Sequence, residues 1–138
     1  NSPITRYGIV KMLKYLYPEY EWLKNKFIIK SYSEISCKWI EGIMKNEGIN
    51  IQYAKSEEGE YHIPGTRYDA DGYCKETNTI YEFHGDYWHG NPNKFNPNDI
   101  FKKNIKFGTK FIKTCIREFE LRGRGYNYVC MWESDYKN

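Results

Sequence analysis

The chain has 138 residues, and its 21 lysines and arginines against 18 aspartates and glutamates give a formal net charge of +3. This length fits one domain that buries enough surface to fold without disulfides or metals. No apolar run reaches the length of a membrane span and no signal peptide is visible, so we expect no membrane partner. Further domains of the same protein and a homodimer both stay open. Scattered single cysteines favour reduced thiols and an intracellular location, the four being Cys37, Cys74, Cys115 and Cys130.

The first predicted elements are two helices. Helical spacing of apolar residues predicts a helix over about residues 8–17, and we take residues 1–30 as a helical N-terminal extension. Ser31 and Glu34 have the spacing of a capping box, so a second helix is expected over about residues 33–46, with Gly48 after it. Its apolar stripe would consist of Ile35, Trp39, Ile40, Ile43 and Met44.

Short strands and a long helix follow. Alternating apolar residues predict a strand over residues 49–53, and further strands are expected over 61–63, 67–74 and 79–84, the last two joined by a tight turn at 75–78. Residues 85–99 are rich in Gly, Pro and Asn and are expected to form a loop, and a final strand is predicted over 126–132. The apolar positions of the long helix before that strand would be Ile105, Phe111, Ile112, Cys115, Ile116, Phe119 and Leu121. A helix must cover each face of such a sheet, which predicts an α/β or α+β sandwich.

Basic residues gather around the predicted long helix. Between Phe101 and Arg124 only Glu118 and Glu120 oppose the basic side chains, which are Lys102, Lys103, Lys106, Lys110, Lys113, Arg117, Arg122 and Arg124. The first thirty residues are also basic, and two basic flanks suit a protein that holds a phosphate backbone. An ordinary solvated helix face would explain the same charges.

Acidic and histidine residues meet in the predicted hairpin. Alternate residues of a strand share a face, so Glu82 and His84 point the same way, and pairing through the 75–78 turn would bring Asp71 near Glu82. Two buried carboxylates repel unless a cation lies between them, and Mg²⁺ is the usual partner. Such an ion activates water and polarises a phosphate, while a nearby histidine handles protons.

Each of these residues also has a simpler explanation. Asp71-Gly72 is a common turn pair, Glu82 could lie on an exposed edge strand, and a single histidine is usually packed or solvent-facing. The concentration of residues favours catalysis, because two of the three histidines, His84 and His89, fall close together beside both acids. Large aromatic residues in the polar loop after them are hard to explain as ordinary surface.

A longer pattern surrounds these residues. Asp71 precedes the run Glu82-Phe83-His84-Gly85-Asp86-Tyr87-Trp88-His89, and Gly125-Tyr126 and Trp132-Glu133 follow it. This pattern resembles the very-short-patch-repair endonucleases and their relatives among phage homing endonucleases, in the PD-(D/E)xK superfamily. The resemblance covers about residues 33 to 135 and is most specific in the histidine–tryptophan–histidine run. It implies a restriction-endonuclease-like fold over residues 31–138, which is a mixed β-sheet flanked by helices.

The resemblance also implies roles for single residues. Asp71 takes the metal-binding aspartate position, Phe83 the position whose backbone carbonyl contacts metal, and His84 and His89 the two catalytic histidines. Tyr87 and Trp88 match aromatic residues that wedge into the DNA stack. Glu82 departs from the repair enzymes, which have an apolar residue there, but matches the glutamate of the wider superfamily, with His84 in place of its lysine.

Other positions depart from the family. The repair enzymes bind a structural zinc, and the matching positions here are Asp86, Asn91, Asn93 and Ser134, so no structural zinc is expected. For the acid that the family carries on an early helix, Glu34 is the nearest candidate, although strict alignment gives Ser36. Thr114 replaces an acid expected on the long helix. These departures weigh against mismatch repair more than against phosphodiester cleavage.

The sequence therefore predicts a Mg²⁺-dependent endonuclease acting on DNA, with Mn²⁺ able to substitute, in a homing, viral or phage, or repair setting. Asp71 and Glu82 would bind metal, and His84 or His89 would move protons. Phosphate contacts are expected from Lys102, Lys103, Lys106, Lys113 and Arg117. The alternatives are a catalytically inactive DNA-binding module of the same fold and an RNA-directed nuclease. A purely structural protein would leave the acid–histidine cluster unexplained.

Overall fold

In the computed structural model the chain divides into two compact units, Asn1–Glu34 and Ile35–Asn138, and the structure describes residues 33–138. The helix predicted over 8–17 and the proposed end of the extension at residue 30 lie outside the described residues. The described elements are α3 (Glu34–Glu47), β1 (Gln52–Tyr53), β2 (Tyr61–His62), β3 (Asp69–Ala70), β4 (Gly72–Cys74), β5 (Thr79–His84), β6 (Ile100–Lys102), β7 (Ile105–Lys106), α4 (Phe107–Gly123), β8 (Asn127–Trp132) and α5 (Glu133–Lys137).

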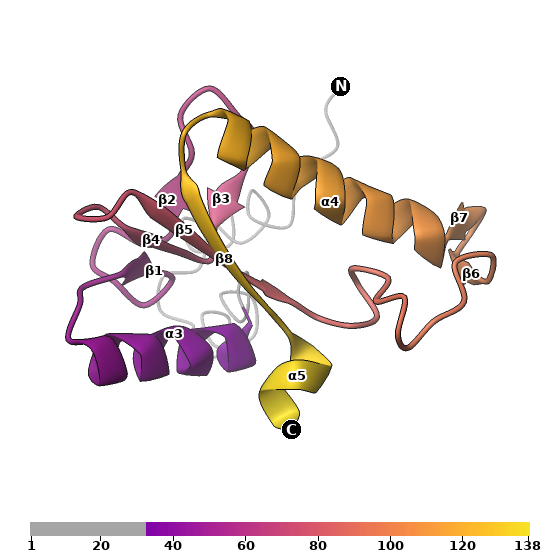
Figure 1. Ribbon diagram of the computed structural model, residues 1–138, viewed down its shortest axis with the longest axis horizontal. Helices are drawn as coiled ribbons and strands as arrows, with labels where there is room; N and C mark the ends of the chain where they lie inside the picture. Colours follow the sequence, from indigo (N-terminus) through magenta and orange to yellow (C-terminus); the bar gives the residue numbers. More distant parts are fainter. Residues whose placement is uncertain (1–32) are drawn as a thin grey trace, which may run out of the picture. The chain divides into compact units, whose positions relative to one another are not determined.

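These elements form a mixed α+β structure with small sheets and, in residues 33–138, three helices (Figure 1). The main sheet has the strand order β1-β4-β5-β8. Its first three strands are antiparallel neighbours, whereas β8 runs parallel to β5. The pairs β2-β3 and β6-β7 make two further small sheets. The predicted mixture of helices and strands is confirmed at this level.

Helix α3 covers one face of the main sheet. Its predicted apolar stripe is confirmed, because Trp39 and Ile40 are buried against Tyr81 and Phe83 of β5, and the other stripe residues pack around them. The helix ends where predicted, since Gly48 has a positive φ of 66° and its N–H is bonded to the Met44 carbonyl. Only a residue tolerant of left-handed backbone closes a helix in this way.

Helix α4 covers the opposite face, so the sheet lies between two helices (Figure 1). Its buried residues are Phe107, Thr114 and Leu121, spaced by seven. The predicted apolar positions are therefore wrong for much of this helix, because Ile112, Ile116 and Phe119 are exposed by 58%, 55% and 82%. Seven-residue spacing places the contact stripe on the other side of the helix from those residues. Cys115 is also exposed, and Ile105 belongs to β7.

The hairpin that carries the candidate site has the predicted form. Strands β4 and β5 pair antiparallel, with Gly72 opposite Tyr81, and the turn between them contains Asn78 at a positive φ of 53°. All six residues of β5 are buried, as expected for a strand covered on both faces. The strand predicted over 67–74 is interrupted, because Asp71 lies between β3 and β4 and belongs to neither.

The loop over residues 85–99 contains no helix or strand, as predicted. It packs tightly against the start of α4: a side chain at Gly90 would place its Cβ 2.2 Å from the Phe107 carbonyl oxygen, and the φ of Gly90 is +62°. The four cysteines are free. Among the helices in the described range, none has the length and apolar character needed to cross a membrane.

Candidate active site

Asp71 and Glu82 are neighbours at the junction of three strands. The backbone N–H of Phe83 donates to Asp71 Oδ2 at 2.7 Å, and the Asp71 N–H in turn lowers the pKa of Glu82 by hydrogen bonding. Burial raises the pKa of Asp71, opposed by the Phe83 N–H and by the positive charge of Arg117. The predicted proximity of the two carboxylates is therefore present in the fold.

Glu82 is held by an arginine. Arg117 Nε lies 2.5 Å from Glu82 Oε1, and Nη2 lies 3.0 Å from Oε2. The same Nη2 donates to the Asp69 carbonyl oxygen at 2.9 Å, which ties α4 to the β3 strand. Burial raises the pKa of Glu82 to about 7, because the attraction of Arg117 offsets only part of the desolvation and Asp71 adds repulsion. Arg117, expected to contact phosphate, thus has a carboxylate partner within the domain.

A third acid, Glu60, belongs to this group and was not found from the sequence. Burial raises its pKa to about 7, with further repulsion from Asp71 and Asp69. It lies in the loop before β2, outside any periodic element, so no spacing pattern pointed to it. The site is therefore rich in carboxylates with raised pKa values. Within residues 33–138, no three His, Cys, Asp or Glu side chains are grouped closely enough to hold a metal by themselves.

His84 and His89 lie side by side, and the charge of Arg117 acts on both rings. Their ring centroids are 4.6 Å apart, and both rings also contact Trp132. Burial lowers the pKa of His84 to about 3, with repulsion from His89 and Arg117 adding to the effect. Burial and the charges of Lys110 and Arg117 lower the pKa of His89 to about 4. Both imidazoles are therefore neutral at neutral pH.

Each histidine has one hydroxyl neighbour. His89 Nδ1 lies 2.9 Å from Thr114 Oγ1, and the Thr114 hydroxyl also lies 3.0 Å from the Lys110 carbonyl oxygen. His84 Nε2 lies 3.4 Å from the Tyr128 hydroxyl. Thr114, which replaces the expected acid on the long helix, is thus in contact with a candidate catalytic residue. Tyr128 was missed because it looks like any aromatic residue of a buried strand.

The two histidines open onto a basic groove of about 440 Å³. Its cationic side chains are Arg67, Lys110, Lys113 and Arg117. The apolar and aromatic part of the groove wall consists of Tyr68, Trp88 and Ile116. Lys110 was not among the expected phosphate contacts, although its spacing from Lys113 and Arg117 along one helix face would have identified it. Four cations beside neutral imidazoles suit a bound phosphate group.

The two aromatic residues expected to contact DNA differ in their surroundings. Tyr87 packs into an aromatic cluster with Phe95, Phe101 and Phe107, and its hydroxyl donates to the Phe101 carbonyl at 3.2 Å. Trp88 is 57% exposed and lines the groove. Tyr87 therefore anchors the loop, and Trp88 is the freer of the two to meet a ligand.

The lysines expected to contact phosphate lie in two places. Lys113 lines the groove on α4. Lys102 lies at its edge, with Nζ 5.1 Å from the Trp88 ring centroid. Lys103 sits at the β6–β7 turn with a positive φ of 54°, and Lys106 ends β7; both are exposed.

The four residues that the sequence resemblance matches to zinc ligands, Asp86, Asn91, Asn93 and Ser134, come together in a hydrogen-bonded cluster. The buried Asn91 donates to Asp86 Oδ1 at 2.8 Å and to Ser134 Oγ at 3.4 Å. The Asn93 N–H donates to Asn91 Oδ1 at 3.0 Å, and the Ser134 hydroxyl contacts Asp86 Oδ1 at 3.3 Å. This cluster fastens the loop after β5 to the start of α5, a connection reinforced by the Asp86 N–H donating to Glu133 Oε1 at 3.1 Å.

Two remaining candidates are placed as follows. Phe83 has its side chain in the core under α3, 5.9 Å from the Trp39 ring, and its backbone N–H serves Asp71. Glu34 is the first residue of α3 and is exposed, whereas Ser36 is buried. The role suggested for Glu34 stays a prediction.

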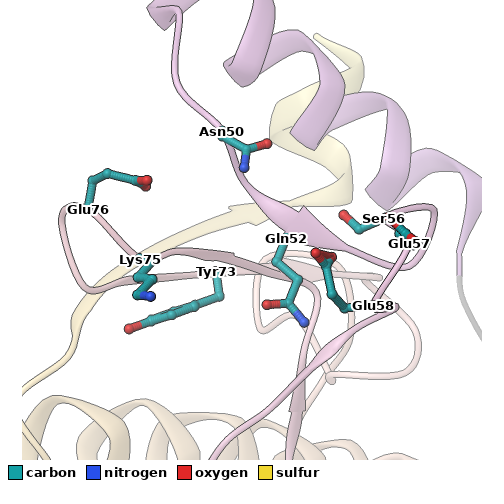
Figure 2. Close-up of a pocket in the computed structure, with 8 residues that line it drawn as sticks. All are labelled: Asn50, Gln52, Ser56, Glu57, Glu58, Tyr73, Lys75 and Glu76. Carbon is teal, nitrogen blue, oxygen red and sulfur yellow. The ribbon is translucent and has the colours of Figure 1, made fainter.

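A second hollow of about 380 Å³ lies near the β1–β4 edge of the sheet. Figure 2 shows Gln52 and Tyr73 on neighbouring strands, with Glu58 beside Gln52. Glu57 and Glu76 also line it, against one basic residue, Lys75. This hollow is therefore mainly acidic, whereas the groove beside the histidines is basic. Compared with models of protein families, with curated protein sequences and with solved structures, the chain matches none.

Proposed function

We propose that residues 31–138 form a metal-dependent DNA endonuclease with a restriction-endonuclease-like fold. The observation that carries the proposal is that Arg117 binds Glu82, the carboxylate beside Asp71, and lines the same basic groove as the two neutral imidazoles. Hydrolysis of a phosphodiester needs these parts together: a site for a cation, a base for water and positive charge for the phosphate. The sequence resemblance described above points to the same reaction.

The donor set fits Mg²⁺. Buried carboxylates with raised pKa values are stabilised by a cation, and Mg²⁺ prefers carboxylate oxygens while keeping several waters, so one or two carboxylates suffice. Asp71 would hold the ion, with Glu82 as the second carboxylate. When bound, the ion would polarise the phosphate and make a coordinated water more acidic. Mn²⁺ takes the same oxygen ligands.

The chain's own residues supply the remaining functions. His84 or His89, neutral because burial lowers the pKa of each, would accept a proton from the attacking water or donate a hydrogen bond to it. Lys110 and Lys113 would hold the backbone phosphates in the groove. The exposed ring of Trp88, with Lys102 beside it, would stack on a base of a distorted duplex.

A second candidate, a catalytically inactive DNA-binding module, is favoured by one observation. Arg117 occupies both oxygens of Glu82, which neutralises the carboxylate that a metal would otherwise share. In such a module the groove would bind DNA and Asp71 would be dispensable. The two candidates therefore differ in what Mg²⁺ and Asp71 contribute.

A cleavage assay on supercoiled plasmid with Mg²⁺, Mn²⁺ or EDTA tests the proposal. Wild type is expected to nick or linearise the plasmid in either metal and to be inactive in EDTA. Asp71→Ala and His84→Ala should each reduce the rate by about 100-fold or more, the usual contribution of a metal ligand or general base.

Matched controls separate chemistry from folding. His62→Ala removes an exposed histidine paired with Asp69, and Asp135→Ala removes an exposed carboxylate of α5. Both should cleave at the wild-type rate. Intact plasmid in every lane, with wild type and Asp71→Ala giving the same gel shift, would instead identify the inactive binding module.

A further inference from the structure

The two hydroxyl neighbours of His84 and His89 determine which nitrogen of each ring carries the proton. A neutral imidazole has one N–H donor and one bare nitrogen, and the hydrogen bond made by one nitrogen decides the state of the other. Each hydroxyl has one hydrogen to donate. Counting donors and acceptors therefore selects one tautomer at each ring.

For His89 the count involves Thr114 and Lys110. The Thr114 hydroxyl lies 3.0 Å from the Lys110 carbonyl oxygen, which can only accept. If Thr114 donates there, its oxygen is free to accept from an N–H on His89 Nδ1, 2.9 Å away, and both contacts are hydrogen bonds. The opposite tautomer turns the Thr114 hydrogen toward Nδ1 and forfeits the bond to Lys110. His89 is thereby left with its proton on Nδ1 and a lone pair on Nε2.

For His84 the count involves Tyr128. Burial, together with the charge of Glu82, raises the pKa of Tyr128, so its hydroxyl keeps its hydrogen. No acceptor other than His84 Nε2, 3.4 Å away, is within hydrogen-bonding distance of that hydroxyl in the described part of the chain. Donation from Tyr128 makes Nε2 the bare nitrogen and puts the ring proton on Nδ1. If His84 Nε2 carried the proton and donated to Tyr128, the hydrogen of the tyrosine hydroxyl would be buried without an acceptor.

His84 Nδ1 is buried and has no hydrogen-bond partner among residues 33–138, while the His84 side chain lines the groove. A buried N–H without an acceptor costs about 1 to 3 kcal/mol. Buried polar groups without a partner are rare in folded proteins, so this nitrogen is a distinctive feature of the ring. The two rings are therefore not equivalent: His84 uses its Nε2 with Tyr128, whereas His89 uses its Nδ1 with Thr114.

We infer that Thr114 and Tyr128 are positioning residues that hold His89 and His84 as Nδ1–H tautomers, so that the Nε2 of His89 carries the lone pair of a proton acceptor and the ring proton of His84 lies on its buried Nδ1. This inference rests on the proposed nuclease function for its catalytic meaning. The tautomers themselves do not depend on that function, because they follow from the contacts of the folded chain.

The test is ¹⁵N–¹H correlation spectroscopy of the histidine rings in the full chain labelled with ¹⁵N-histidine, at neutral pH without metal. The chain has three histidines, so the ring signals are few enough to assign by substitution. Both His84 and His89 are expected to show the Nδ1–H pattern, although the free side chain prefers the proton on Nε2. An Nε2–H pattern at either ring in the wild type would overturn the inference for that ring.

Variants test the cause. Thr114→Val should shift only His89 toward the Nε2–H form, Thr114→Ser should keep the wild-type pattern, and Thr109→Val, an exposed threonine of the same helix, should change nothing. Tyr128→Phe should shift only His84, with Tyr81→Phe on the other face of the sheet as its control. Amide spectra report whether each variant is folded. Unchanged ring patterns in folded Thr114→Val and Tyr128→Phe would show that these residues do not set the tautomers.

A cleavage measurement separates this inference from the proposed function. If the chain is a nuclease, Thr114→Val should lower kcat by about tenfold or more with little change in KM, and Thr114→Ser should restore it. A chain that shows the expected tautomers but cuts nothing contradicts the proposed function alone. An active chain with Nε2–H rings contradicts the inference alone.

Discussion

Arg117 binds Glu82 through two nitrogens, Nε at 2.5 Å and Nη2 at 3.0 Å, across the interface between α4 and β5. The Glu82 side chain is 5% exposed and the Arg117 side chain is 27% exposed, so the pair is largely withdrawn from water. Burial raises the pKa of Glu82 to about 7, and the charge of Arg117 offsets part of this effect. Removing one partner of such a pair should therefore cost more than breaking a surface ion pair, because the other group stays buried without its partner.

Removing Arg117 should strongly destabilise the domain. Arg117→Ala leaves Glu82 buried without its partner, and losing one member of a buried pair costs about 3 to 5 kcal/mol of unfolding free energy. Urea denaturation measures this destabilisation. It should be smaller near pH 5 than at pH 8, because a carboxyl whose pKa is raised in the fold takes up a proton and becomes neutral at the lower pH.

The matched control is Arg122→Ala. Arg122 pairs with Glu118 one helical turn away, at 2.9 Å, and both side chains are more exposed, at 55% and 34%. Exposed pairs of this type contribute about 1 kcal/mol or less. Equal destabilisation in the two variants would contradict the view that the Arg117–Glu82 pair is a buried one.

Glu60 should make stability depend on pH. Its pKa is raised from 4.5 to about 7 by burial and by the neighbouring Asp71 and Asp69, so the folded state favours the protonated form. Its stabilising contribution is complete below pH 4.5 and is lost as the pH rises through 7. Glu60→Gln removes this dependence. The variant should melt at nearly the wild-type temperature at pH 4.5 and a few degrees above it at pH 8.

Thermal unfolding followed by circular dichroism across this pH range measures the difference. Glu58→Gln, an exposed glutamate two residues away, should follow the wild-type curve at every pH. If the melting temperatures of Glu60→Gln and wild type change with pH in the same way, the pKa of Glu60 is not raised in the folded protein.

Phosphate binding in the groove should depend on Lys110 and Lys113. Every phosphate that a basic side chain neutralises on duplex DNA steepens the slope of log K against log salt by about 0.9, so each alanine variant should flatten the slope by roughly one unit. Fluorescence anisotropy with a labelled duplex in EDTA, at several salt concentrations, measures the slope without cleavage. The slope should be reduced further in the double variant.

Lys75→Ala is the control for these lysines, because Lys75 lies at the acidic hollow instead of the groove (Figure 2). Its slope should equal that of the wild type. If the Lys110→Ala and Lys113→Ala variants also bind with the wild-type slope, the groove is not the surface that contacts the phosphates.

Much of the local structure was predictable from the sequence. The stripe that includes Trp39 and Ile40 predicted α3 and its buried face, and the strand expected after the 75–78 turn has the bounds of β5 to the residue. The turn after β4 and the pairing that brings Asp71 to Glu82 followed from the same patterns. These features are local, so the spacing of side chains along one element is enough to predict them.

The face of α4 that packs against the sheet could not be predicted in this way. Apolar residues at 112, 116 and 119 form a regular stripe, yet this stripe faces away from the sheet. The buried residues of the helix are instead Phe107, Thr114 and Leu121, and Arg117 forms hydrogen bonds with Glu82 of the sheet. A polar threonine and an arginine on the contact side give no hydrophobic signal, so periodicity favoured the wrong face.

The sequence by itself determined which residue types are present and which face of each strand they share. Only the tertiary structure paired Arg117 with Glu82, Thr114 with His89 and Tyr128 with His84, contacts that join residues 35, 25 and 44 positions apart. The physical reason is that such contacts depend on how two whole elements pack, which is decided by burial of the entire core. The spacing of residues within one helix or strand does not predict which other helix or strand packs against it.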